Sequence, residues 1–112
     1  MTPMEIIIAA LAKAEQEPAQ VQVWDVEPND PLLKIPGQRR LARAVRDDEG
    51  REVIIYDRTA DPSSLGPLLQ HETAHIAAWR QHGEGIKEHG PEFLKICRAL
   101  VETRPSYYCK KD

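Results

Sequence analysis

The segment from Pro67 to Gly83, PLLQHETAHIAAWRQHG, constrains the fold of this chain more than any other stretch. Proline is acceptable in an α-helix mainly within the first turn, and glycine commonly follows the last turn. We therefore predict a helix that begins near Leu65, is capped by Asp61 or Ser64, and ends at Gly83.

Three residues in the middle of this predicted helix, His71, Glu72 and His75, form the pattern HExxH. Residues four apart on an α-helix differ by about 40° in direction and lie about 6 Å apart along the axis, so the two imidazoles can hold one ion. Glu72 is turned by about 100° from His71, which keeps its carboxylate out of the ligand set but near a water on the metal. The spacing is typical of a metal site with an adjacent base.

A catalytic zinc ion has three protein ligands and one open position, so this helix alone supplies too few. The spacing HExxHxxGxxH would require glycine at 78 and histidine at 81, where the chain has Ala78 and Gln81. His82 is one residue out of that register, and we expect it at the surface near the end of the helix. The third ligand must therefore come from another part of the chain.

His89, in KEHGPEF, is the preferred third ligand. Thirteen residues separate it from His75, which is enough for the loop GEGIKE to turn the chain back. Imidazole also suits zinc. Glu92 and Glu102, on the helix predicted to follow, are the acidic alternatives, and the loop length and ligand chemistry favour His89 over both.

The motif HETAH followed by HGPEF resembles the SprT-like (Spartan-type) zinc metalloproteases, in which HExxH precedes, past a short loop, a histidine in an HG-x-x-F context. The likeness extends from about residue 53 to residue 100. It implies that His71, His75 and His89 bind one zinc ion and that Glu72 is the catalytic glutamate.

The activity implied by the resemblance is zinc-dependent hydrolysis of peptide bonds in a protein or peptide substrate. Zinc lowers the pKa of a water molecule and polarises the scissile carbonyl, while Glu72 accepts the water's proton and later passes it to the leaving amine. Tyr107 or Tyr108 would assist at the oxyanion, although terminal aromatic residues more often pack. Two alternatives stay open: an ImmA/IrrE-like regulatory protease with an acidic third ligand, and a non-catalytic binding module stabilised by zinc.

Several SprT-like proteins continue into a zinc ribbon that opens with a Tyr-x-Cys element. Here YYCKKD contains Cys109 alone, so we expect one zincin-like domain over residues 1–112 and no ribbon. The family's association with proteins crosslinked to DNA often relies on added basic segments. Because the net charge is −3, nucleic-acid association is implied only by the resemblance and is not supported by composition.

The segments around the motif predict a small α+β domain of about three helices and a small antiparallel or mixed sheet of about three strands. Thr2, Pro3 and Glu5 form the signature of a capped first helix. VQVWDV at 21–26 alternates as a strand, and the proline-containing stretch at 27–38 is expected to be a loop.

A hairpin is predicted over residues 40–58, with DDEG at 47–50 as its turn and residues 53–56 in its second strand. RRLARAVR, in the first arm, would be equally compatible with a helix. In zincins a strand beside the cleft commonly pairs with an extended substrate, and either arm could do so. A last helix begins at Pro91 and has an apolar face made of Phe93, Leu94, Ile96, Cys97, Leu100 and Val101.

Location and surface follow from a few residues. Cys97 and Cys109 belong to no CxxC pair and make no disulfide framework, which favours a reducing, intracellular setting. The apolar run at 6–12 is too short to span a membrane and has no basic leader. We expect a cytoplasmic protein without a membrane anchor.

Four arginines lie close to Asp47, Asp48 and Glu49 in the sequence, and we expect them to form a solvated, salt-bridged face. These arginines are Arg39, Arg40, Arg43 and Arg46.

Overall fold

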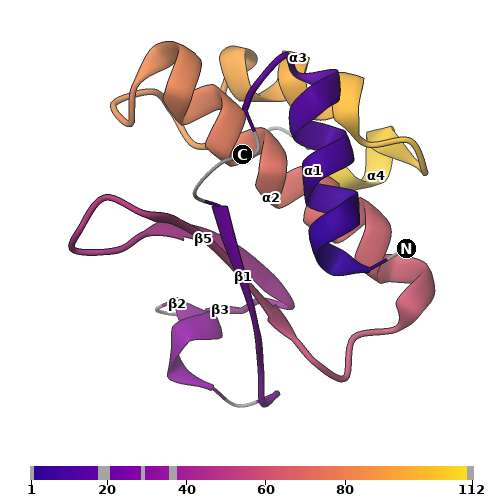
Figure 1. The fold of residues 1–112 in the computed structure, drawn as a ribbon. Helices are drawn as coiled ribbons and strands as arrows, with labels where there is room; N and C mark the ends of the chain where they lie inside the picture. The colour runs from indigo at the N-terminus through magenta and orange to yellow at the C-terminus, as the bar shows by residue number, and fades with distance from the viewer. Residues whose placement is uncertain (1, 18–20, 29, 36–37, 111–112) are drawn as a thin grey trace.

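The structure, a computed structural model, describes residues 2–17, 21–28, 30–35 and 38–110. These residues form four α-helices, a mixed three-stranded sheet and a two-stranded sheet, which confirms the predicted α+β class. Figure 1 shows the four helices gathered on one side of the larger sheet. Within the described ranges, no helix is both long enough and apolar enough to cross a bilayer.

The larger sheet has the strand order β1-β5-β4, so β5 (Glu52–Asp57) is central and β4 (Ala42–Arg46) lies at an edge. β1 (Val21–Val26) runs parallel to β5, and β4 runs antiparallel to it. The predicted strand and hairpin are both confirmed, and the first arm of the hairpin is a strand rather than a helix. The hairpin turn includes Gly50 at φ 80°, a conformation that glycine adopts readily.

The stretch predicted as a loop after β1 contains more regular structure than expected. It has the 3₁₀ turn η1 (Pro31–Leu33) and β2 (Lys34–Ile35), which pairs with β3 (Gln38–Arg39). The Asp30 side chain accepts a hydrogen bond from the N–H of Leu32 at 2.8 Å and caps η1. A short polar cap and a two-residue ladder leave little trace in hydrophobic periodicity, so the pattern did not reveal them.

Strand β5 is buried on both faces, which explains why EVIIYD does not alternate. On the helical side Ile54 packs in a core cluster with residues of α1 and α2. On the opposite side Val53 and Ile55 pack against Leu33 of η1. The sheet therefore separates two apolar layers, and the helical layer carries the histidines.

Helix α1 (Pro3–Lys13) has the predicted capping box. The N–H of Thr2 donates to Glu5 Oε1 at 2.8 Å, and the N–H of Glu5 donates to Thr2 Oγ1 at 3.1 Å. Proline cannot continue a helix, so the sequence predicts that Pro18 ends this one. The helix ends five residues earlier, at Lys13, and Pro18 lies outside the described residues.

Helix α2 (Pro62–His82) begins three residues earlier than predicted, with the Asp61 side chain accepting from the N–H of Ser63 at 2.8 Å. Pro67 therefore lies inside the helix, and its placement in the first turn was wrong. The proline removes only the bond that its own N–H would give to the carbonyl of Ser63, one turn from the start. The end at Gly83 is confirmed.

An ion pair fixes the far end of α2 to the central strand. The Arg80 guanidinium donates to the Glu52 carboxylate, with the shortest contact from Nη2 to Oε1 at 2.6 Å. Arg80 Nη1 also donates to the carbonyl of Glu17 at 2.7 Å. Because both ends of the pair are largely buried, α2 is held in one position over the sheet.

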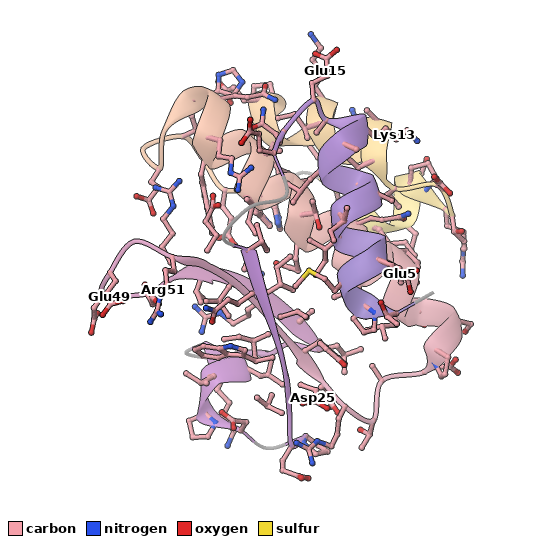
Figure 2. All side chains as sticks on the ribbon, viewed as in Figure 1. Glu5, Lys13, Glu15, Asp25, Glu49 and Arg51 are labelled. Atoms are coloured by element: carbon pink, nitrogen blue, oxygen red, sulfur yellow. A yellow bond between two sulfur atoms is a disulfide. The ribbon has the colours of Figure 1, made fainter. Side chains whose placement is uncertain are left out.

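Helix α3 (Pro91–Leu100) begins at the predicted proline, and α4 (Pro105–Tyr108) was not predicted. Cys97 on α3 and Cys109 after α4 form a disulfide, seen as the yellow bond inside the molecule in Figure 2. The expectation of unpaired cysteines was wrong, because the chain reverses after α3 through Arg104, at φ 51°, and returns Cys109 to α3. The inference of a reducing setting from these residues loses its basis.

Two arginines of the predicted face, Arg40 and Arg46, are ion-paired, but with other partners, and Arg43 Nη1 donates to the carbonyl of Leu32 at 2.9 Å. Arg40 Nη1 lies 3.5 Å from Glu88, and Arg46 contacts Glu84 at 3.1 Å and Glu52 at 3.6 Å. Asp47, near the hairpin turn, pairs instead with Arg51, while the side chain of Arg39 lies outside the described residues.

Candidate metal centre

The three predicted histidine ligands come together in the structure. His71 and His75 lie one turn apart on α2, and His89 approaches them from the loop before α3. Their ligand atoms all lie within 4.8 Å of one another. The ring centroids form a nearly equilateral triangle, with sides of 5.0, 5.2 and 5.3 Å. The cluster offers three imidazole nitrogens to one small volume.

Phe93, in the first turn of α3, supports all three rings. Its ring centroid lies 4.1 Å from that of His75, in a stacked arrangement, 5.1 Å from that of His71 and 5.0 Å from that of His89. The side chain is fully buried. Its place in the predicted apolar face of the last helix is confirmed, but its contact with the histidines gives it a second role that hydrophobic periodicity alone did not indicate.

The orientation of His71 is fixed by the main chain of α4. Nδ1 of His71 lies 2.7 Å from the carbonyl oxygen of Tyr108. Because a carbonyl only accepts, Nδ1 must carry the hydrogen, which leaves the lone pair on Nε2. Burial lowers the pKa of His71 to about 4, although the Tyr108 carbonyl opposes this, so the imidazole is neutral at pH 7.

His75 is buried more deeply than His71. Burial, followed by the neighbouring His71 and His89, lowers its pKa to about 2. Among the described residues, no hydrogen-bond partner reaches its buried Nε2 atom. A buried polar atom without a partner is costly, and a cation would satisfy it. This nitrogen is the strongest local sign that the cluster fits a metal ion.

Glu72 lies beside the cluster but is not a member of it. Its Oε2 atom is 3.9 Å from His71 Nε2, and its Oε1 atom accepts a 2.9 Å hydrogen bond from the N–H of Ala44 on β4. Burial raises the pKa of Glu72 to about 8, against the lowering effects of Arg40 and the Ala44 N–H. A nearby dication would favour the charged form of this carboxyl.

The two acidic alternatives for the third ligand are not part of the cluster. The carboxylate of Glu102 is exposed and lies 3.7 Å from the ammonium of Lys13 on α1. Glu92 lies on α3 but belongs to no group of candidate ligands within the described part of the chain. His82 is exposed, as predicted.

Two hollows flank the cluster, and Arg40 lines both. The smaller has a volume of about 120 Å³ and lies beside His75, Glu72 and Glu88. The larger has a volume of about 400 Å³ and brings together side chains of the loop before β4, β4, α2 and the C-terminal segment: Arg40, Leu41, Ala42, Ser64, Leu68, His71, Glu72, Tyr107, Tyr108 and Lys110. The cluster is therefore accessible from a cleft between β4 and α4.

The groups that hold this site in place could not be identified from the sequence. The Tyr108 carbonyl and the Ala44 N–H are main-chain atoms, so no residue type marks them. Arg40 was assigned only to the salt-bridged face. The even number of cysteines was the one available signal for the disulfide next to His71.

Compared with models of protein families, with curated proteins and with solved structures, this chain gives no match.

Proposed function

We propose that this chain is a zinc-dependent metallopeptidase that uses His71, His75 and His89 as metal ligands and Glu72 as the general base. The observation that carries the proposal is the triangle of three imidazoles with one carboxylate oxygen 3.9 Å from a ligand nitrogen. Three nitrogen ligands and an open fourth position are the usual arrangement of a catalytic zinc. The resemblance of HETAH and HGPEF to the SprT-like proteases supports the same assignment.

The roles of the side chains follow from their positions. A zinc ion in the cluster would lower the pKa of a water molecule and polarise the scissile carbonyl. Glu72, held by the Ala44 N–H, takes the proton of the attacking water and delivers it to the leaving amine. His71 and His75 contribute neutral nitrogens because burial lowers the pKa of each.

The edge position of β4 suggests how a substrate would lie. Alternate backbone groups of an edge strand face away from the sheet, where an extended peptide can pair with them. β5 is covered on both sides by neighbouring strands, so β4 is the arm of the hairpin available for this purpose, apart from the N–H of Ala44, which donates to Glu72. A peptide along β4 would place one side chain in the hollow lined by Leu41, Leu68 and Tyr107.

Arg40 is the better candidate for stabilising negative charge on the substrate. Its guanidinium lines both hollows and lies close enough to lower the pKa of Glu72 and of both helix histidines. Tyr107 and Tyr108 also line the larger hollow, so assistance at the oxyanion by one of these tyrosines is a second proposal. We favour Arg40, because a permanent positive charge stabilises an oxyanion more strongly than a neutral hydroxyl.

The proposal is tested by incubating the purified, zinc-loaded chain with a mixture of unstructured peptides and identifying new termini by mass spectrometry. Cleavage should disappear on chelation and return when zinc is added. Zinc binding at one equivalent without cleavage of any peptide, including the chain itself, would favour the non-catalytic module. Within the described residues, no acidic side chain joins the histidine cluster, so no observation favours the ImmA/IrrE-like alternative.

A further inference from the structure

His71 belongs to the histidine cluster and also contacts the disulfide. Its Nδ1 atom lies 2.7 Å from the Tyr108 carbonyl oxygen and 3.7 Å from Cys97 Sγ. The bonded partner of Cys97 is Cys109, the residue directly after Tyr108. The cross-link therefore ends next to the carbonyl that selects which nitrogen of His71 faces the metal.

The segment that carries this carbonyl has little else to hold it. α4 is four residues long, and a helix of this length is not stable by itself. Tyr107 is exposed, and Tyr108 is only half-buried against the core cluster in which Cys97 and Cys109 are both buried. The bond between the two cysteines is thus the one covalent fixed point of the segment.

We propose that the Cys97–Cys109 disulfide positions His71 through the Tyr108 carbonyl, so that the metal affinity of the cluster depends on whether the two cysteines are bonded. Oxidised, the chain holds Nδ1–H against the carbonyl and presents Nε2 to the metal. Reduced, the segment from 105 to 109 loses its fixed point, and His71 rotates and exchanges between its two tautomers. Groups that orient a metal-bound histidine in this way change metal affinity by about 10- to 100-fold.

The chemical step is thiol–disulfide exchange with a dithiol. The dithiol gives up two electrons and two protons as it becomes a disulfide, and the bond between Cys97 and Cys109 becomes two thiols. The metal changes neither its charge nor its oxidation state. This inference rests on the metal site of the proposed function but not on peptide hydrolysis.

The test compares zinc affinity in the two states of the full chain, by competition with a chromophoric chelator. A water-soluble phosphine serves as the reductant, because a dithiol would itself bind zinc; it takes up oxygen from water as the two thiols form. We expect the oxidised chain to bind zinc about 10- to 100-fold more tightly than the reduced chain, and reoxidation to restore the affinity. The variant Cys97→Ala/Cys109→Ala should match the reduced chain and should not respond to the phosphine.

Histidine tautomers in the metal-free chain separate positioning from a general loss of structure. Long-range ¹H–¹⁵N spectra should show only the Nδ1–H form of His71 when the disulfide is present and a mixture when it is reduced. Equal zinc affinity in the two states, with reduction verified by mass, would overturn the inference and leave the peptidase proposal intact. A fall in affinity with an unchanged His71 tautomer would also overturn it. Zinc binding in neither state would overturn both proposals, and tight, redox-dependent binding without hydrolysis would overturn only the peptidase.

Discussion

The backbone N–H of Ala44 donates a 2.9 Å hydrogen bond to Oε1 of Glu72 and so joins the edge strand β4 to the helix that carries two of the histidines. The second carboxylate oxygen, Oε2, is left 3.9 Å from Nε2 of His71. One oxygen of Glu72 is thus used for position and the other is next to the cluster. This arrangement determines what a change at Glu72 should do.

Glu72→Gln should retain zinc and lose peptide cleavage by at least about 100-fold, because an amide can still accept from Ala44 but cannot take a proton from water. Zinc stoichiometry and the rate of peptide cleavage are measured on the same preparation. The same replacement at Glu92, on α3 and outside the cluster, is the control and should leave both unchanged. Undiminished cleavage by Glu72→Gln would eliminate the proposed mechanism.

His89→Ala should weaken zinc binding by more than about 100-fold, because it removes one of three ligands rather than a group behind them. Glu92→Ala should have almost no effect, since Glu92 is not in the cluster. His82→Ala, which removes an exposed histidine, is the matched control for loss of an imidazole. If chelator competition ranks Glu92→Ala as the more damaging change, the third ligand is acidic.

The metal-free chain should be most stable near pH 6.5 to 7. The pKa values of His71 and His75 are lowered in the folded state, to about 4 and about 2, so the unfolded chain binds more protons and stability falls as the pH drops below 6.5. The pKa of Glu72 is raised to about 8, so the folded chain keeps a proton that the unfolded chain has released. Stability therefore also falls as the pH rises towards 8, by about 1 kcal/mol from pH 6.5.

Urea denaturation in the presence of a chelator measures this profile at a series of pH values. Glu72→Gln should abolish the decline above pH 6.5 and should steepen the fall of stability between pH 6.5 and 4.5, where the Glu72 proton otherwise offsets part of the histidine effect. An equally steep alkaline decline in Glu72→Gln would show that another group causes it.

Phe93→Leu should weaken zinc binding more than Leu94→Ala does, although it should cost less stability. Leu94→Ala removes a buried side chain of the same helix at about 2–5 kcal/mol, whereas Phe93→Leu keeps most of the buried volume. Phe93 contacts all three imidazoles, so its replacement releases the rings even where the core stays filled. Zinc affinity and the free energy of unfolding are measured for both variants. If the less stable variant is also the one that binds zinc more weakly, Phe93 has no separate effect on the histidines and this role is contradicted.

The histidine cluster could be predicted from sequence because helical periodicity fixes His71 against His75 over a single turn. His89 followed from the length of one loop and from the chemistry of imidazole. The α1 capping box, β1 and the hairpin were predictable because each is encoded by neighbouring residues. The prediction placed Pro67 in the first turn of α2, but the helix begins earlier, directly after its Asp61 cap. This earlier start costs only the one hydrogen bond that the missing N–H of Pro67 would have made.

The remaining features depend on contacts between distant segments. Ala44 meets Glu72 across 28 positions, and Tyr108 meets His71 across 37, in both cases through main-chain atoms. The disulfide required the chain to reverse at Arg104, a non-glycine residue with positive φ. No local sequence pattern predicts such a reversal, so neither α4 nor the disulfide could be located from the sequence alone.

The different sequence distances within the site also set an order for its assembly. The three histidines of the cluster belong to one segment of nineteen residues, from 71 to 89, which a single loop closes. Glu72 is held instead by a strand from a separate part of the chain. Contacts that are near in sequence form sooner during folding than contacts that are far apart. We expect the refolding chain to form the histidine cluster before the hairpin docks, so that, under the proposed function, metal binding precedes the placement of Glu72.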